Sequence, residues 1–350
     1  MGKVCSFRKG YGIAKDDLSS DGTPCILYGE LYTTYKTAIA KTIKSKTSLQ
    51  SKSLVYSQKD DVIIPCSGET AEDIATSICV PYDGILLGGD LTIVHSDLDG
   101  AFLSNQINSV RKYDIARIAQ GKSIVHLQAD ELKKIFIFYP SIQEQRKISA
   151  FIDKIDERIE IQNKIISKYE TLIKGLCDMI FRYNKSVSLS DLVKCKTSAL
   201  QENMVSTCHR GEYKVLGASG AIAAIDTYQF EESGILVLKD GSKAGKIQFA
   251  QGKYSVVGTS VVLIPNEACD ARYLYFAMSS IDFEKYKVGS GIPHIYFKDY
   301  SNERIYYPDK ALRKKITKTL DFYETMVEIE RKMLSAMQKQ KAFLLQSMFI

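Results

Sequence analysis

The chain has 350 residues, of which 45% are hydrophobic and 25% charged, a composition typical of globular domains and not of disordered chains. It contains no apolar run near the ~18 residues of a membrane-spanning helix and no signal-peptide pattern, so we expect a cytoplasmic protein outside the membrane. The net charge is only +6, and the eight cysteines and four histidines are too scattered for a zinc site, so we expect no metal and no cofactor.

Two clusters of lysines interrupt the otherwise balanced charge. The first lies between Glu30 and Asp60, contains no acidic residue and consists of Lys36, Lys41, Lys44, Lys46, Lys52 and Lys59. The second lies around Asp240 and consists of Lys239, Lys243, Lys246 and Lys253. Such clusters suit contact with nucleic-acid phosphates. A solvated loop explains either cluster equally well.

Residues 1–140 predict a β-rich domain. Short apolar runs at Val62–Ile64 and Ile93–Val94 are bounded by Gly, Asp and Ser, which is typical of strands separated by turns. The stretch 101–118 predicts a single helix.

Residues 141–182 predict a long helix. It follows Pro140 and begins with a capping box, in which Ser141 is the N-cap and Glu144 the third helical residue. Steps of four and three residues trace a coiled-coil seam in which nine of ten positions are apolar or aromatic. The seam consists of Ile148, Ile152, Ile155, Ile159, Gln162, Ile166, Tyr169, Ile173, Leu176 and Ile180.

Residues 183–308 and 309–350 predict a second β-rich domain and a second long helix. The expected strands are Ile235–Leu238, Val256–Val257 and Ser260–Ile264, with one helix over 271–287. Asp309 can cap the second long helix, but Leu312 stands where Glu144 stands in the first. Its seam is Ile316, Leu320, Tyr323, Val327, Glu330, Leu334, Met337, Lys341, Leu344 and Met348.

An internal repeat relates the two halves. With an offset of 168, residues 121–181 align without gaps to 289–349, and 15 of 61 positions are identical, including Gly121/Gly289 and His126/His294. The chain is therefore expected to be an α+β protein with two β-rich domains and two long helices that form a coiled coil. Two amphipathic helices packed on a globular core are the alternative.

The usual catalytic motifs are missing. The sequence has no phosphate-binding Gly-x-x-x-x-Gly-Lys loop, no Asn-Pro-Pro-aromatic stretch, no Gly-x-Ser-x-Gly and no His-Glu-x-x-His. We therefore expect no catalytic residue in this chain. Two equivalent domains on a rigid spacer suit the reading of two DNA half-sites a fixed distance apart.

The residues Ile137–Ile148, the helix that follows and its second copy from Ile305 to Phe349 resemble the two conserved regions of type I restriction–modification specificity (S) subunits. The resemblance implies target recognition domains at 1–140 and 183–308 and conserved helices at 141–182 and 309–350, paired as an antiparallel coiled coil. It further implies that each domain reads half of a bipartite double-stranded DNA target. The expected partners are methyltransferase subunits, two in number, and motor/nuclease subunits. Leu312-Arg313 departs from the family's Glu-Gln pair.

Candidate DNA contacts can be named within these domains. His126 and His294 occupy paired positions after a glycine, which suggests a shared loop near DNA, although ordinary turn histidines would look the same. Polar and charged side chains of many types read base edges, so residue type does not rank the candidates. The candidates are Tyr28, Glu30, Tyr32, Lys36, Ser67, Glu69, Thr70 and His126, then Ser219, Lys239, Ser242, Lys243, Ser290 and His294.

Two other functions fit the same layout. A coiled-coil scaffold protein that never reads DNA would show the same two helices. A specificity subunit whose methyltransferase and nuclease are fused in one partner chain would have the same sequence features.

Overall fold

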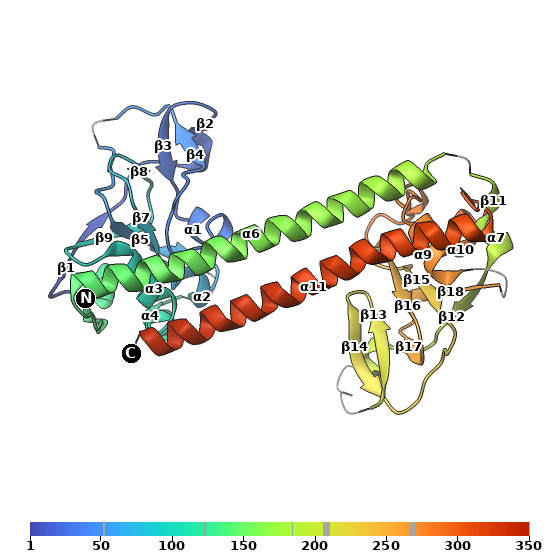
Figure 1. The fold of residues 1–350 in the computed structure, drawn as a ribbon. Helices are drawn as coiled ribbons and strands as arrows, with labels where there is room; N and C mark the ends of the chain where they lie inside the picture. The colour runs from blue at the N-terminus through green and yellow to red at the C-terminus, as the bar shows by residue number, and fades with distance from the viewer. Residues whose placement is uncertain (52, 122–123, 184, 206–210, 267–269, 350) are drawn as a thin grey trace. The chain divides into compact units, whose positions relative to one another are not determined.

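Two long helices, α6 (Ile142–Phe181) and α11 (Lys310–Met348), run through both units of the chain (Figure 1). The structure is a computed structural model that describes residues 1–51, 53–121, 124–183, 185–205, 211–266 and 270–349. Unit 1 comprises Met1–Asn163 and Lys332–Ile350, and unit 2 comprises Lys164–Arg331. Each unit thus contains one globule and a part of both long helices, so the unit boundary passes through the predicted helical segments 141–182 and 309–350.

The globule of unit 1 is built on two four-stranded sheets and a two-stranded ribbon. The first sheet has the order β1 (Cys5–Lys9), β9 (Leu91–Ser96), β5 (Asp61–Pro65), β7 (Ile78–Val80). The second has the order β2 (Leu18–Ser19), β4 (Ser45–Thr47), β3 (Thr23–Ile26), β8 (Leu86–Leu87), and β6 (Ser67–Gly68) pairs with β10 (Val125–His126). The helices are η1 (Lys15–Asp17), α1 (Glu30–Thr33), α2 (Ala71–Ile74), α3 (Gly100–Asn108), α4 (Lys112–Ile118) and α5 (Ala129–Lys134).

The globule of unit 2 repeats this plan. Its main sheet has the order β12 (Val193–Thr197), β18 (Ser260–Pro265), β15 (Gly234–Leu238), β16 (Ile247–Ala250). Smaller sheets are β14 (Gly220–Ile225), β13 (Tyr213–Gly217), β17 (Tyr254–Val256) and the pair β11 (Val187–Ser188), β19 (Arg304–Ile305). The helices are α7 (Leu189–Leu192), α8 (Glu202–Val205), α9 (Ala271–Met278), η2 (Glu284–Tyr286) and α10 (Phe297–Tyr300).

The main sheets of the two units are equivalent in pairing and cover. In each sheet a fully buried central strand, β5 or β15, pairs antiparallel with β9 or β18. A helix packs on each sheet, α3 on β5 and β7 in unit 1 and α9 on β15, β16 and β18 in unit 2. Because both faces of each central strand are buried, the apolar residues are continuous over Val62–Ile64 and Ile235–Leu238 and do not alternate, while the buried Asp61 forms an ion pair with Arg8 at 2.6 Å. The expected α+β architecture is confirmed.

Two predicted single helices are each broken in the structure. The stretch 101–118 forms α3 and α4, and 271–287 forms α9 and the short η2. At the first break the Ser109 hydroxyl donates to the carbonyl of Asn105 at 2.7 Å, and at the second Ser280 donates to Ala277 at 2.8 Å. These hydroxyls satisfy carbonyls that the last turn of a helix leaves without an amide partner.

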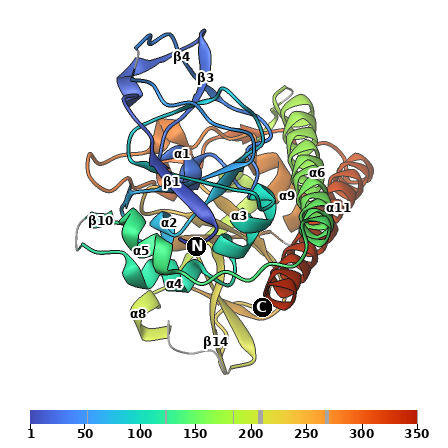
Figure 2. The ribbon, with the colours of Figure 1, turned by 90° about the vertical axis from the view of Figure 1, so that its left-hand side faces the viewer.

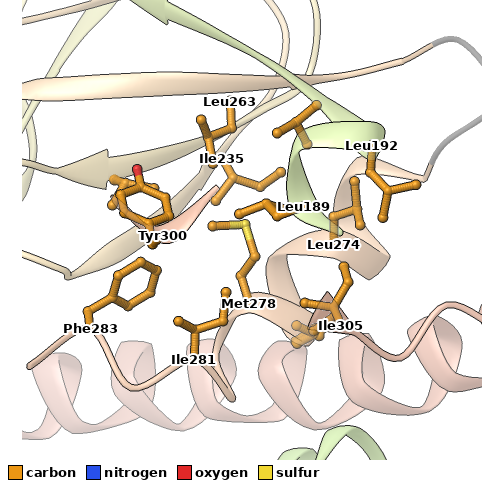
Figure 3. Close-up of a cluster of buried hydrophobic side chains, with 14 of the residues drawn as sticks. Leu189, Leu192, Ile235, Leu263, Leu274, Met278, Ile281, Phe283, Tyr300 and Ile305 are labelled. Carbon is orange, nitrogen blue, oxygen red and sulfur yellow. The ribbon is translucent and has the colours of Figure 1, made fainter. Parts of the chain in front are cut away.

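The core of unit 2 is shared between the globule and the long helices. Figure 3 shows side chains from α7, β15, β18 and α9 converging on one cluster, among them Leu189, Ile235 and Met278. Cys177 and Phe181 of α6 and Leu320 of α11 belong to the same cluster. Full burial of each large apolar side chain contributes about 1.5–3 kcal/mol, so this cluster holds the helix ends to the globule.

The long helices pair antiparallel within each unit. In unit 1, Lys341 of α11 contacts Asp156 of α6, and in unit 2 the rings of Tyr169 and Tyr323 lie 6.4 Å apart. Also in unit 2, Arg331 forms an ion pair with Glu170 at 2.5 Å. Each of the twenty seam positions named above is buried or half-buried. The expected antiparallel coiled coil is confirmed.

The helix starts show how each cap works. Ser141 accepts from the Glu144 amide at 3.4 Å, while the Glu144 carboxylate lies 3.5 Å from Lys147. The Asp309 carboxylate accepts from the amides of Ala311 and Leu312 at 2.9 and 3.0 Å, as predicted.

At Leu312-Arg313 the chain departs from the Glu-Gln pair that the resemblance predicts, and the structure accommodates the change locally. Gln145 donates to the carbonyl of Pro140, and Arg313, its repeat equivalent, donates to the carbonyl of Pro308. The Arg313 guanidinium also lies 4.1 Å from the centre of the Tyr307 ring. The long side chain at this position therefore keeps the same backbone contact although its type has changed.

A polar pair interrupts the seam in unit 1. Lys341 and Asp156 form an ion pair at 2.5 Å, with side chains only 19% and 10% exposed. Burial raises the pKa of Asp156 even though Lys341 opposes the shift. A carboxyl group with a raised folded-state pKa favours folding at low pH, and that contribution is lost as the pH rises through the folded-state pKa.

We expect Lys341→Met to lower the free energy of unfolding by about 1–3 kcal/mol at neutral pH, because it leaves the Asp156 carboxylate buried without its cation. The deficit should shrink at mildly acidic pH, because the raised pKa of Asp156 means that its carboxyl group takes up a proton more readily than an ordinary one. Urea unfolding of the full chain at both pH values measures this, with the exposed Lys339→Met as control. The double variant Asp156→Leu with Lys341→Leu should regain the lost stability, and failure to do so would contradict the unpaired-charge explanation.

Candidate nucleic-acid interface

Each unit contains a tight turn that ends in a histidine. Gln120 and His126 exchange two backbone hydrogen bonds of 2.7 and 2.9 Å, and Val288 and His294 exchange two of 2.8 and 2.9 Å. The two turns lie at repeat-equivalent positions. The sequence repeat is therefore also a repeat of backbone geometry at the two histidines.

A glycine makes each turn possible. Gly121 has a φ of +137° and Gly289 a φ of +99°, a region that side-chain-bearing residues rarely adopt. A Cβ atom on Gly289 would lie 2.7 Å from the carbonyl oxygen of Ile292, and one on Gly121 would lie 1.9 Å from that of Ile124. The glycines thus allow the close backbone approach that sets the histidine positions.

Each histidine faces a polar residue from the loop after the central strand. In unit 1, His126 pairs with Ser67 across β10 and β6, and Ser67 Oγ lies 3.2 Å from His126 Nδ1. In unit 2, Asp240 Oδ1 lies 2.8 Å from His294 Nδ1, with both side chains about a third exposed. The structure therefore brings together the predicted residues Ser67 and His126 in one unit, and His294 beside Lys239 and Asp240 in the other.

The two loops that meet the histidines carry opposite charge. When Gly68 is matched to Gly241, the loop of unit 1 has Glu69, Glu72 and Asp73 where the loop of unit 2 has Ser242, Gly245 and Lys246. The unit 2 loop adds two more lysines, Lys239 and Lys243, of which Lys243 is exposed. The two loops, each next to its histidine turn, thus present an acidic surface in unit 1 and a basic surface in unit 2.

Two tyrosines adjoin the acidic loop. Tyr32 on α1 is half-buried, and its hydroxyl would lie 3.7 Å from a Cβ atom built on Gly29. Burial raises the pKa of Tyr32, and the neighbouring Tyr28, Asp73 and Glu69 raise it further. The predicted contacts Tyr28, Tyr32 and Glu69 therefore lie near one another. The loop that carries Glu69 leads into α2, which packs on β10, and both elements are labelled in Figure 2.

Three predicted contacts of unit 1 have structural roles or lie elsewhere. The Glu30 carboxylate accepts from the Leu27 amide at 2.8 Å and from the Ser45 hydroxyl at 2.5 Å, so both of its oxygens are engaged. Thr70 caps α2 by accepting from the Asp73 amide at 3.1 Å. Lys36 lines a groove against α6 and not the histidine turn.

One lysine of the first cluster is engaged by a long helix. Lys41 forms ion pairs with Asp153 at 2.6 Å and Glu157 at 2.9 Å, so its charge faces carboxylates of α6. The phosphate-binding stripe between Glu30 and Asp60 stays a prediction, in which the Lys41 charge is already paired with carboxylates of α6. Lys52 lies outside the described residues.

The remaining candidates of unit 2 lie in exposed turns. Ser219 is in the β13–β14 hairpin, whose Ala218 carbonyl accepts from Lys246 at 3.4 Å. Ser242 is exposed in the basic loop, and Ser290 is exposed in the histidine turn. The Gly241 amide donates to the Pro293 carbonyl at 2.9 Å, which ties the basic loop to the histidine turn.

Asp240 belongs to this surface but was absent from the sequence candidates, and Lys246 was named only in the second lysine cluster. A signal for Asp240 was available, because it aligns with Ser67 in the repeat and precedes a glycine as Ser67 does. Its contact with His294, 54 residues away, depends on the sheet that joins the two segments.

The described part of the chain lacks both a metal-binding cluster and a membrane-spanning helix. It holds no group of three or more His, Cys, Asp or Glu side chains placed to bind a metal ion. None of its helices is both long and apolar enough to cross a membrane.

Comparison with known proteins places the chain. Residues 1–171 and 183–338 match the family model "Type I restriction modification DNA specificity domain". The type I restriction enzyme MjaVIII specificity subunit of Methanocaldococcus jannaschii is 28% identical over 122 residues, which are 34% of this chain and 28% of that relative. The aligned part is thus little more than a quarter of the relative's length.

Solved structures share the fold. The S subunit of a type I restriction–modification system from M. genitalium matches with a TM-score of 0.68 and 16% identity, over 100% of this chain and 94% of that chain. A chain from a structural study of complex assembly and conformational transition of the type I R-M system matches with a TM-score of 0.58 and 15% identity, over 99% and 95% of the two chains. Since the family model matches both halves of the sequence, this protein belongs to the type I restriction–modification DNA specificity family.

Proposed function

We propose that this chain is the DNA-reading specificity subunit of a type I restriction–modification complex. Each globule reads one half of a bipartite double-stranded target, and the paired helices set the distance between the halves. The observation that carries the proposal is the repeated constellation of a glycine turn, a histidine and a loop after the central strand, with Ser67 and His126 in unit 1 and Asp240 and His294 in unit 2. Dimeric DNA readers use the same logic, with one equivalent surface per half-site.

The opposite charges of the two loops give the two globules different tasks. The lysines of the basic loop suit phosphate contact, which is sequence-independent and weakens as salt rises. Carboxylates such as Glu69 only accept hydrogen bonds, and in the major groove the donors are the amino groups of cytosine and adenine. Unit 2 therefore supplies more of the salt-dependent affinity, and unit 1 relies more on base contacts.

Catalysis belongs to partner subunits in this proposal. The chain supplies DNA binding, while methyltransferase subunits transfer the methyl group and motor/nuclease subunits join for cleavage. The long helices offer a docking surface, because each has exposed apolar residues away from its seam: Ile161, Leu172 and Met179 on α6, and Phe322, Ile329, Met333 and Phe343 on α11. Ile161 and Ile329 are repeat equivalents, so we infer two copies of one partner, each a methyltransferase subunit.

Lys243→Ala should reduce the dependence of DNA affinity on salt. If Lys243 contacts a phosphate, the slope of log affinity against log salt should fall by about 0.9. The affinity of the assembled methyltransferase complex for its target, measured at several salt concentrations, gives this slope. Thr70→Ala, at the equivalent position of unit 1, should leave the slope unchanged. An unchanged slope for both variants would place Lys243 away from the DNA.

Gly289→Ala should weaken target binding without unfolding the chain, because the new Cβ clashes with the Ile292 carbonyl and displaces His294. The expected loss is roughly 1–3 kcal/mol, comparable to one lost base contact. Gly291→Ala is the matched control, since a Cβ there meets nothing within 4 Å. Equal affinities for the two variants would rule out the turn as part of the interface. Binding by the assembled complex and melting of the chain are the measurements.

Ile329→Asp should remove one of two methyltransferase subunits, because it places a charge in one docking surface and leaves the equivalent surface at Ile161 intact. Native mass spectrometry of the reconstituted complex gives the stoichiometry. The double variant with Ile161→Asp should bind none, and Ser335→Asp, an exposed control on the same helix, should bind two. Full assembly of the double variant would exclude this stripe as the docking surface.

A further inference from the structure

In each unit, a cation from the globule bridges two carboxylates of a long helix. In unit 1, Lys41 contacts Asp153 and Glu157 of α6 at 2.6 and 2.9 Å. In unit 2, Arg272 contacts Asp321 of α11 at 2.5 Å and also pairs with Glu324. Asp153 and Asp321 are identical positions of the repeat, whereas Glu157 and Glu324 are not equivalents, so one of the two carboxylates is common to both units.

The globule side of the contact differs between the units. Lys41 lies in the segment between α1 and β4, whereas Arg272 lies in the first turn of α9. These positions are not repeat equivalents. The same helix position therefore binds a cation from two unrelated parts of the globule. The ion pair is thus present in both units although its cation comes from a position that the repeat does not share.

Both ion pairs border open grooves. In unit 1 a groove of about 350 Å³ separates residues 34–44 from α6, with lysines on the globule side and Asp153, Asp156, Glu157 and Glu160 on the helix side. In unit 2 a groove of about 1040 Å³ lies between the β16 region and α11, with Lys246 and Lys253 on one side and Asp321, Glu324 and Glu328 on the other. Because the facing surfaces are not closely packed there, the ion pairs link the two sides of each groove, and in unit 2 the Tyr275 hydroxyl also donates to Glu324 at 3.3 Å.

The two links differ in how strongly solvent screens them. The Arg272 side chain is 24% exposed, and its guanidinium lies 4.8 Å from the centres of the Phe249 and Phe276 rings. It adjoins the core cluster that α9 shares with both long helices. The Lys41 side chain is 44% exposed. Exposed ion pairs weaken as salt rises, whereas partly buried ones are screened much less.

We propose that Lys41 is a positioning residue that latches the first globule to α6 through Asp153 and Glu157, and that this latch opens with salt while the Arg272 link stays closed. The first globule then turns on its remaining junction, where the Phe102 and Phe349 rings lie 5.0 Å apart, the Asp99 carboxylate accepts from Ser149 at 2.6 Å and the Asp99 amide donates to Gln145 at 3.0 Å. One consequence rests on the proposed function. A closed latch holds the first reading surface at one angle to the helix pair and so restricts the spacer between the half-sites.

The latch can be tested on the full chain without DNA. Single-molecule energy transfer is measured between dyes at Tyr113 on α4 and Arg158 on α6, both exposed, and between a second pair at Asp226 and Lys318 in unit 2. At low salt we expect one narrow transfer distribution for each pair. At about 1 M salt, where the Debye length is about 3 Å, the unit 1 distribution should broaden and the unit 2 distribution should not.

Variants identify the charge contact as the cause. Lys41→Glu should broaden the unit 1 distribution at low salt, and adding Asp153→Lys and Glu157→Lys should narrow it again. Lys46→Glu, an exposed lysine on β4, is the matched control and should resemble the unaltered chain. A distribution unchanged by Lys41→Glu overturns the latch, as does broadening that the charge exchange fails to reverse.

The spacer consequence has a separate readout. In the assembled complex, Lys41→Glu should allow methylation of targets whose spacer is one base pair shorter or longer, with the bases of both half-sites unchanged. Unchanged spacer selection together with a broadened dye distribution would keep the latch and overturn its role in spacing. If the unaltered complex methylates no bipartite target, the proposed function fails, while the dye measurements still decide the latch.

Discussion

The apolar seam between α6 and α11 is the interaction on which both units depend. Unit 1 contains residues 332–350 from the far end of the chain, and Phe349 reaches the Phe102 ring at 5.0 Å only because α11 returns along α6. Unit 2 closes its core with Phe181 and Leu320, one from each helix. Neither unit is complete without both helices, so seam formation and folding of the globules are one cooperative process.

The seam also has to fix the register of the two helices, and its polar residues contribute to this. An unbroken apolar stripe allows sliding, whereas a buried polar residue limits the registers in which every group is satisfied. Lys341 and Asp156 satisfy each other in unit 1, while Ile173 stands at the repeat equivalent of Lys341 in unit 2. The repeat is therefore not symmetric in chemistry, although the helices match in phase.

The same asymmetry marks the candidate interface. The backbone of the histidine turn needs a glycine at φ near +100° or above in both units, and this requirement explains why Gly121 and Gly289 are both present. The loops opposite carry no such steric requirement, and their charges are opposite. A frame set by backbone geometry thus presents two different chemical surfaces, which is what two unlike half-sites would require.

Patterns in the sequence were enough to predict the two long helices, the repeat and the class of fold. Heptad periodicity, the capping residues Ser141 and Asp309 and the paired glycines are local patterns, and local patterns can be recognised without knowing what packs on them. The breaks at Ser109 and Ser280 were missed because a serine is also tolerated inside a helix, where its hydroxyl bonds a carbonyl of the preceding turn without ending it.

Which side chains come into contact depends on tertiary packing. Pairing of β6 with β10 places Ser67 beside His126, and the engagement of Lys41 by α6 removes it from the expected phosphate stripe. Glu30 is likewise occupied by Leu27 and Ser45. These contacts join residues from a few to more than a hundred positions apart, and their partners depend on how sheets and helices pack, which no local pattern in the sequence encodes.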